Sequence, residues 1–343
     1  MGSVSSGRLP HSATLVNGWT PARFPVFVVG CERSGTTLLY HALLSAGGFA
    51  VYRRETHIFN SIVPKFGGLR SAASRQRLLD RWVRSRNFEL SGLEPASFCE
   101  QVMAECHSGG DFIRIFMESV ARAQGMERWS DCTPAHLLYM PQIKAQIPDA
   151  RFIHIVRDGR DAALSLERQG WIDPMPWERG AGILAAALHW EWMVRVGRRY
   201  GRALGADYLE VKFEDVVNRP AEVFPGIAEF IGQPMELDAI RAAGIGSVSE
   251  PNTSFRAGDG AAEFNPVGRW KALPQPELAE LEAAIGGTLG AFGYAPSCVP
   301  DASEIRRLAR KRRTYHAVFG AKLWLKKYTP LGRVLTGLEA LDD

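Results

Sequence analysis

An eight-residue loop near the N-terminus, GCERSGTT at positions 30–37, has the composition of an anion-binding site. It lies between the short apolar run 24–29, typical of a buried strand, and a helical pattern. The backbone amides of such a loop and the positive end of the following helix bind phosphate-like groups. Arg33 adds a planar guanidinium, and Thr36 and Thr37 add hydroxyl donors. We therefore expect an anion site here; the alternative is a tight turn capped by its Ser and Thr residues.

The loop differs from that of nucleoside triphosphatases, GxxxxGK[ST], at one important position. Thr36 stands where those loops have lysine. Without that lysine, a β,γ-phosphate pair loses its principal countercharge. A phosphotransferase that uses ATP and magnesium is therefore the less favoured alternative.

A second anion site is predicted from RDGRDAALS at positions 157–165. Arg157 ends an apolar, strand-like run, and Ser165 follows eight residues later inside the next helical pattern. Arginine suits a doubly charged phosphate, and serine can add a hydrogen bond from the adjacent helical turn. Asp158 and Asp161 are better explained as parts of a salt-bridged helix cap.

Both sites resemble those of sulfotransferases that use 3′-phosphoadenosine 5′-phosphosulfate (PAPS). RSGTTLL at 33–39 looks like the family's 5′-phosphosulfate loop, and Arg157 with Ser165 is similar to its 3′-phosphate site. Three further segments match the family in order. The family's strand ending in Lys-Thr-Pro is matched by 129–134, and its Tyr-Glu-Asp-Leu element by 211–216. The late loop that closes over the cofactor is matched by 267–271. The resemblance covers residues 24–294. It implies that PAPS is bound by Arg33, Ser34, Gly35, Thr36, Thr37, Arg157, Ser165, Phe213, Arg269, Trp270 and Lys271.

The general base is expected in RETH at positions 54–57. This segment resembles Glu-Thr-Arg of tyrosylprotein sulfotransferases, in which the glutamate is the base, and the resemblance implies that role for Glu55. His57 is the alternative base, because cytosolic members of the family use histidine. In the non-catalytic alternative, Glu55 is a surface glutamate that pairs with Arg53 or Arg54 and has no chemical role.

The leaving group needs positive charge, which Arg33 is expected to supply. Relatives often have lysine before Thr-Pro, whereas this chain has Cys132, which offers no stable positive charge. Either Arg33 acts alone, or another cation such as Arg269 or Lys271 substitutes.

Strand-like runs alternate with helical patterns along the chain, which indicates an α/β fold. We expect a P-loop-NTPase-like, three-layer fold with a central, mostly parallel sheet flanked by helices. Strands are expected at 24–29, 49–52, 152–156 and 208–213, and helices at 135–146, 162 onward, 182–200, 216–230 and 277–289. The expected organisation is a flexible lead at 1–23, a sulfotransferase domain at 24–300 and a basic segment at 301–343.

The composition of the 343 residues, 46% hydrophobic and 23% charged, is that of a folded chain rather than a disordered one or a membrane bundle. We expect neither a secretory signal nor a spanning helix. The five cysteines are odd in number and show no CxxC spacing, so neither a disulfide framework nor a metal site is expected. A cytoplasmic location is the resulting prediction.

The net charge of +4 arises in the C-terminal segment, since residues 305–335 contain ten Lys or Arg and no Asp or Glu. Aromatic and aliphatic residues are interleaved with them. Such a segment can lie peripherally on an anionic membrane, or dock on its own domain as a solvated helix. The near-neutral remainder argues against a nucleic-acid partner.

The sequence therefore predicts a metal-independent transferase that moves a sulfuryl group from PAPS to a hydroxyl acceptor. A non-catalytic nucleotide-binding module is the second alternative, because Cys132 replaces a lysine. Peptide tyrosine, carbohydrate, lipid and small-molecule acceptors all remain open. Trp171 and Trp177, in a loop with two prolines, either roof an apolar acceptor pocket or pack on the core.

Overall fold

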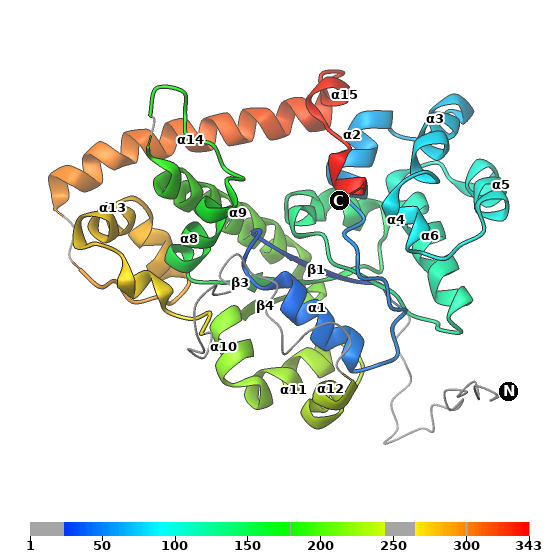
Figure 1. The fold of residues 1–343 in the computed structure, drawn as a ribbon, viewed down its shortest axis with the longest axis horizontal. Helices are drawn as coiled ribbons and strands as arrows, with labels where there is room; N and C mark the ends of the chain where they lie inside the picture. Colours follow the sequence, from blue (N-terminus) through cyan, green and yellow to red (C-terminus); the bar gives the residue numbers. More distant parts are fainter. Residues whose placement is uncertain (1–23, 179, 244–264, 299–300, 343) are drawn as a thin grey trace, which may run out of the picture.

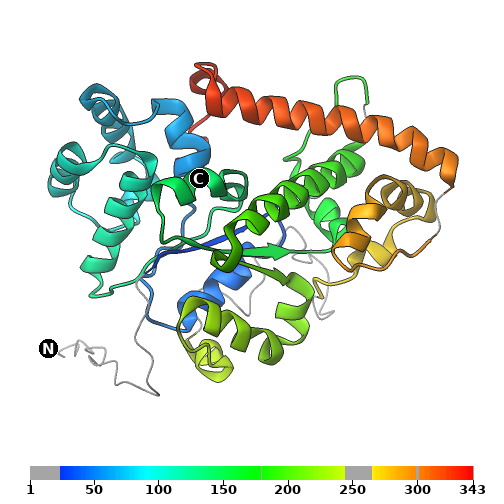
Figure 2. The same ribbon diagram turned by 180° about the vertical axis from the view of Figure 1, so that it is seen from behind.

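The computed structural model describes residues 24–178, 180–243, 265–298 and 301–342. At its centre lies a sheet of four parallel strands in the order β2, β1, β3, β4, seen from opposite sides in Figure 1 and Figure 2. The strands are β1 Val26–Gly30, β2 Ser130–Asp131, β3 Arg151–Val156 and β4 Tyr208–Lys212. The predicted α/β fold with a central parallel sheet is confirmed.

Helices cover both faces of this sheet, which makes the fold three-layered. Alternate side chains of a strand point to opposite faces. Accordingly, Val26 and Val28 of β1 belong to one buried cluster, whereas Phe27 and Val29 belong to the other. A strand buried on both faces must be apolar at every position, and this is why the run 24–29 was recognisable.

The helices differ widely in length. The α-helices are α1 Thr36–Ser45, α2 Val63–Phe66, α3 Ala72–Trp82, α4 Arg86–Glu89, α5 Pro95–Glu105, α6 Gly109–Ala123, α7 Met140–Gln146, α8 Gly159–Gln169, α9 Gly182–Leu204, α10 Phe213–Asn218, α11 Pro220–Ile231, α12 Leu237–Ala243, α13 Gln275–Ala291, α14 Ala302–Tyr328 and α15 Gly332–Leu335. A π-helix, η1 Ile58–Ile62, and the 3-10 helices η2 Pro134–Tyr139, η3 Gly205–Asp207, η4 Arg269–Ala272 and η5 Glu339–Leu341 complete the list.

Three predicted elements differ from the structure. The stretch 49–52 forms one isolated bridge, from Phe49 to Arg128, and is not a strand. The helix expected at 216–230 is two helices, since Pro220 disfavours a helical conformation at the preceding residue. The helix expected at 135–146 begins as η2 and becomes α-helical only at Met140, next to Pro141.

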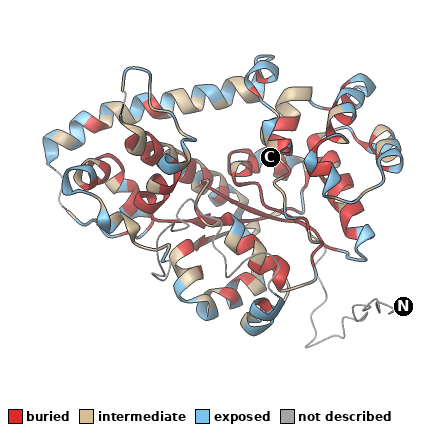
Figure 3. Ribbon diagram, viewed as in Figure 1, coloured by how far each residue is buried: buried red, intermediate tan, exposed pale blue. Residues whose placement is uncertain are grey.

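The C-terminal segment folds as one long helix that packs on the body. α14 lies against α9 and α13, and α15 lies against α2. Leu308 and Tyr315 are the buried residues of α14, while the rest of the helix is exposed or half-buried, as Figure 3 shows. The division at residue 300 stays a prediction, and the expected lead at 1–23 lies outside the described residues.

Candidate active site

All four strands end at the same edge of the sheet, because they are parallel. A residue singled out from the sequence follows each strand: Arg33 after β1, Cys132 after β2, Arg157 after β3 and Phe213 after β4. The carboxyl edge of a parallel sheet is where α/β proteins bind ligands. The topology therefore gathers at one edge segments that are far apart in the sequence.

The loop between β1 and α1 contains a buried polar atom without a partner. Arg33 and Gly35 have positive φ angles of 65° and 93°. A Cβ atom on Gly35 would lie 2.2 Å from Cδ2 of Phe213, so only glycine fits at this position. Ser34 is buried, and its Oγ has no hydrogen-bond partner among the described residues. Such an orphaned hydroxyl fits a site where a ligand supplies the partner.

The two predicted anion-binding arginines are neighbours. Arg33 Nε donates a hydrogen bond of 2.9 Å to Ser165 Oγ. Arg157 Nη1 donates one of 3.0 Å to the carbonyl oxygen of Arg33, 124 residues away in the sequence. Burial lowers the pKa of the Arg33 guanidinium, and the charge of Arg157 lowers it further. Two guanidinium groups that repel each other form a suitable site for a multiply charged anion.

Arg157 is also held from its other sides. Its guanidinium lies 4.7 Å from the centroid of the Phe213 ring, and its Nη2 donates a hydrogen bond to the carbonyl of Pro266. Its Nε is buried and has no partner among the residues that the structure describes. Arg157 is thus fixed in position and retains one buried donor for a ligand.

The acidic residues of the second motif do two different things. Asp158 accepts a hydrogen bond of 3.0 Å from the Arg160 backbone at the start of α8 and forms an ion pair of 2.7 Å with its side chain. Asp161 instead accepts backbone hydrogen bonds of 2.7 and 2.9 Å from Gly268 and Trp270. The expected salt-bridged cap therefore describes Asp158, whereas Asp161 binds the backbone of η4 to α8.

The remaining predicted cofactor residues differ in exposure. Thr36 is buried, whereas Thr37 is exposed. Arg269 and Trp270 are half-buried in η4, and Lys271 is exposed, with its Nζ 5.9 Å from the centroid of the Trp270 ring.

Glu55 and His57 flank a residue that is anchored in the core at the end of β2. Thr56 is fully buried; its backbone nitrogen donates to Thr133 Oγ1 at 3.0 Å and its hydroxyl donates to Asp131 Oδ1 at 2.6 Å. Asn87 Nδ2 donates a hydrogen bond of 2.8 Å to the Glu55 carbonyl. The backbone of 55–57 is thus fixed by the core, and both side chains project from a rigid segment.

The side chains of Glu55 and His57 form a pair. His57 Nε2 lies 3.3 Å from Glu55 Oε2, and Asn60 Nδ2 lies 3.1 Å from His57 Nδ1. The amide therefore donates to Nδ1, and the ring proton sits on Nε2, facing the carboxyl group. Burial lowers the pKa of His57 to about 4, so the ring is neutral near pH 7.

Glu55 has the properties of a poised acid or base. Burial and the negative charges of Glu32 and Asp131 raise its pKa to about 8. A carboxyl group with a pKa this close to neutrality can accept and release a proton under working conditions.

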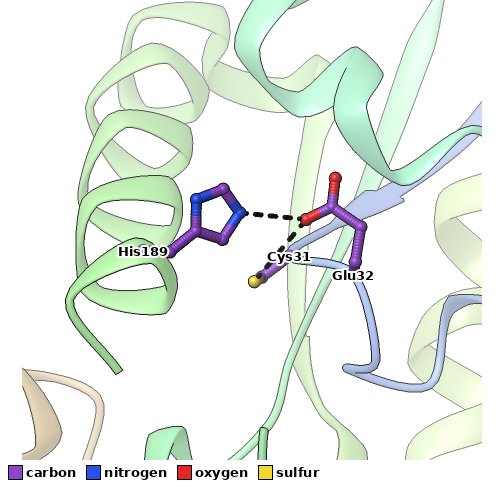
Figure 4. Close-up of side chains that lie close together, drawn as sticks. All are labelled: Cys31, Glu32 and His189. Atoms are coloured by element: carbon purple, nitrogen blue, oxygen red, sulfur yellow. Dashed lines mark hydrogen bonds and ion pairs between the residues drawn. The ribbon is translucent and has the colours of Figure 1, made fainter. Parts of the chain in front are cut away.

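A second carboxylate–histidine pair, which the sequence did not reveal, lies close by. Glu32 Oε2 is 3.2 Å from His189 Nε2 and 3.9 Å from Cys31 Sγ, and Figure 4 shows the three side chains. Burial opposes ionisation of Glu32, but the hydrogen bond and charge of His189 outweigh it and lower its pKa. The thiol of Cys31, the carboxylate of Glu32 and the imidazole of His189 have ligand atoms within 4.8 Å of one another. Divalent metals bind to side chains of these three types.

Cys132 lies between the loop 30–37 and Glu55. Its thiol is buried. Burial, followed by the charges of Glu55 and Asp131, raises the pKa of this thiol well above its usual value. The group is therefore neutral and gives no charge to the site.

Of the two loop tryptophans, one borders the site. The guanidinium of Arg33 lies 5.6 Å from the centroid of the Trp171 ring. Trp177 is 72% exposed and lies beside α14.

The fold is that of a P-loop-like α/β protein, and the candidate anion site lies at the carboxyl ends of its strands. A sequence profile described as the sulfotransferase family matches residues 25–237. The chain therefore belongs to the sulfotransferase family and is an enzyme of that family. A search of curated protein sequences finds no significant match.

Solved structures of bacterial sulfotransferases resemble the fold. The sulfotransferase domain of the Synechococcus PCC 7002 olefin synthase has a TM-score of 0.50 and 19% identity, covering 81% of this chain and 99% of its own. The sulfotransferase domain of the curacin biosynthetic pathway has a TM-score of 0.45 and 16% identity, covering 64% and 77%. A sulfotransferase from Mycobacterium avium has a TM-score of 0.43 and 15% identity, covering 80% and 78%.

Proposed function

We propose that the enzyme transfers the sulfuryl group of PAPS to a hydroxyl acceptor and releases adenosine 3′,5′-bisphosphate. The observation that carries this proposal is the contact between two arginines, Arg33 and Arg157, beside two buried donors, Ser34 Oγ and Arg157 Nε, that have no partner among the described residues. Two anionic groups on one ligand would satisfy both sets of donors.

In this proposal the loop 33–37 binds the 5′-phosphosulfate, and Arg157 with Ser165 binds the 3′-phosphate. PAPS supplies an activated sulfuryl group whose leaving group is a phosphate. Phe213 and the η4 residues Arg269, Trp270 and Lys271 enclose the nucleotide. The hydrogen bond from Arg33 to Ser165 supports this arrangement, since it couples the two phosphate sites.

Glu55 is proposed to take the proton of the acceptor hydroxyl. His57 orients it, because the neutral imidazole donates through Nε2 to the Glu55 carboxylate before that carboxylate takes the proton. Arg33 stabilises the charge on the departing phosphate, and Cys132 contributes none. His57 as the base is the alternative, and its lowered pKa counts against it.

Two other functions are less well supported. Thr36 at the lysine position of the loop counts against an ATP-dependent phosphotransferase. The Glu55–His57 pair counts against a non-catalytic nucleotide-binding module, in which such a pair would have no use. The cytoplasmic location and the absence of a metal stay predictions.

The test is to incubate the protein with a cell extract and PAPS that is labelled in its sulfuryl group. We expect label to appear on a hydroxyl of one acceptor class, with equal release of adenosine 3′,5′-bisphosphate. Transfer of the γ-phosphate of ATP, with no transfer from PAPS, would contradict the proposal. The identity of the labelled product decides among peptide, carbohydrate, lipid and small-molecule acceptors.

A further inference from the structure

One face of α14 is exposed along the whole helix. Seven of its exposed residues recur every three or four positions, so they form a single stripe. In order, they are Arg306, Arg310, Arg313, Ala317, Ala321, Trp324 and Tyr328; Ala302, Ser303, Ile305, Arg307, Thr314 and Lys322 of α14 are exposed as well. The first half of the stripe is cationic and the second half aromatic.

The aromatic end of the stripe continues into α15. Trp324 and Tyr328 are 57% and 71% exposed, and Val334 is 80% exposed, with Leu331 and Leu335 exposed beside it. Of the ten large apolar side chains exposed among the described residues, six lie between positions 305 and 335. Single exposed apolar residues need no explanation, but a concentration of this kind marks an interaction surface.

The cations of the stripe differ from the other basic residues of α14. Lys311, Arg312 and Arg307 turn toward the body and pair with Glu178, Glu191 and Glu280, respectively. Arg306, Arg310 and Arg313 make no ion pair with any residue that the structure describes. The packing of α14 therefore uses one set of cations and leaves the other facing outward.

A cavity of about 700 Å³ adjoins the cationic end of the stripe. It lies between the loop that carries Met175 and Trp177 and the first turns of α14, and Arg306 and Arg310 line it. Trp177 is exposed at its border. Two guanidinium groups without an ion pair in the described structure, beside an exposed tryptophan, suit a phosphate-bearing headgroup next to acyl chains.

We propose that this surface, formed by the stripe of α14, by α15 and by Trp177, docks the enzyme on an anionic membrane. The aromatic and aliphatic end enters the boundary between headgroups and acyl chains, and the arginines contact lipid phosphates. Trp and Tyr are the side chains that favour this boundary. No helix among the described residues is long and apolar enough to cross a membrane.

The same helix also reaches the catalytic side of the molecule. The ring of Phe319, on α14, lies 5.4 Å from that of His189, which pairs with Glu32. Docking through the stripe would thus place the membrane against a helix that contacts the site. This link to catalysis rests on the proposed function, whereas membrane binding does not.

The experiment is cosedimentation of the full chain with vesicles of phosphatidylcholine alone or mixed with phosphatidylglycerol. We expect binding to the mixed vesicles only. Arg306→Gln, Arg310→Gln and Arg313→Gln together should lower the partition coefficient on the order of 100-fold, since each cation near an anionic surface contributes about 1 kcal/mol. Trp324→Ser with Tyr328→Ser should lower it roughly tenfold or more at both low and high salt, because apolar insertion is not screened.

The matched control replaces three exposed arginines elsewhere, Arg77, Arg84 and Arg122, by glutamine. It removes the same charge and should retain vesicle binding. Affinity for adenosine 3′,5′-bisphosphate should be equal in all variants, which shows that they are folded. Failure of the wild-type chain to bind mixed vesicles would overturn the proposal, as would equal losses in the control. Concentration-dependent dimerisation that Trp324→Ser abolishes, without vesicle binding, would instead assign the surface to a second copy.

Discussion

At the scale of single residues, the candidate site combines buried donors that have no partner in the described part of the chain with a carboxyl group of raised pKa. Ser34 Oγ and Arg157 Nε are buried and unpaired within the described residues, so a ligand that pairs with both gains their full hydrogen-bond energy. Glu55, with its pKa raised to about 8, faces the histidine that orients it. In the proposed reaction, binding and proton transfer are therefore carried by different residues.

Replacing the base should separate these two tasks. Glu55→Gln keeps the size of the side chain but removes its basicity, and we expect turnover to fall on the order of 10² to 10⁴-fold. Affinity for adenosine 3′,5′-bisphosphate should hardly change. Single-turnover assays, with the acceptor that the labelled PAPS identifies, provide the measurement. Near-normal turnover in Glu55→Gln with a large loss in His57→Ala would move the base to His57.

The pH dependence should identify the base independently. Glu55 must be ionised to accept a proton, and its pKa is raised to about 8. We therefore expect kcat/KM to rise with pH up to about pH 8 and then to level off. If His57 were the base, with its pKa of about 4, the rise of kcat/KM with pH would instead lie near pH 4. Rates measured from pH 4 to pH 10 distinguish the two, and a flat profile near pH 8 would contradict the assignment to Glu55.

Some of the site could be predicted from single residues and some could not. Arg33, Ser34 and Arg157 stood out because a strand, a loop and a helix pattern surround them. The Glu32–His189 pair did not, because His189 is one position among many in the helical pattern of α9. Only the packing of α9 on β1 brings its ring to the loop.

At the scale of elements, the turn between β1 and α1 depends on Gly35. A side chain there would need a positive φ and would meet the ring of Phe213. Gly35→Ala should therefore lower stability by about 1 to 3 kcal/mol and weaken binding of adenosine 3′,5′-bisphosphate. Thermal unfolding and calorimetric titration measure the two effects.

The control is a glycine without such constraints. Gly287 is an exposed residue of α13, and a Cβ atom there meets nothing within 4 Å. Gly287→Ala should raise stability by about 0.5 to 1 kcal/mol, because alanine favours the helix. If Gly35→Ala behaved like Gly287→Ala, the proposed shape of the loop would be wrong.

Helices and strands were predictable where the hydrophobic periodicity of the sequence is strong. They were less predictable where prolines or single backbone pairings determine the bounds of an element. The long helices α9 and α13 and the strands β1, β3 and β4 lie close to their expected bounds. Pro220 separates α10 from α11 because it disfavours a helical conformation at Arg219, and Pro141 lies in the first turn of α7, where its missing backbone donor is tolerated. The stretch 49–52 is apolar and mostly buried, yet it forms a single bridge, from Phe49 to Arg128, and no strand.

At the scale of the whole molecule, the order of the strands creates the site. Four parallel strands bring their ends to one edge, and each supplies a segment there. The sequence predicted a parallel sheet, but the strand order and the position of α14 along the outer side emerge only from the fold. Contacts between segments far apart in sequence, such as Phe319 with His189, have no local signal.

Metal dependence is a property of the whole enzyme that distinguishes the proposed reaction from phosphoryl transfer. A sulfuryl group carries less negative charge than a phosphoryl group and the loop lacks the lysine, so we expect turnover to survive EDTA. The assay compares rates before and after chelation and after addition of Mg²⁺ or Zn²⁺. Loss of activity that Zn²⁺ restores would assign a metal role to Cys31, Glu32 and His189, and strict Mg²⁺ dependence with tighter binding of ATP would favour a kinase.

The measurement that tests the central claim most directly is calorimetric titration of adenosine 3′,5′-bisphosphate and adenosine 5′-phosphate into the wild type and Arg157→Ala. The account predicts that the wild type prefers the bisphosphate and that Arg157→Ala weakens it by roughly tenfold to 100-fold, since a charged hydrogen bond contributes about 1.5 to 3 kcal/mol. Binding of the monophosphate should change much less. Equal losses for both nucleotides, or no preference in the wild type, would contradict the assignment of Arg157 to the 3′-phosphate and with it the proposed use of PAPS.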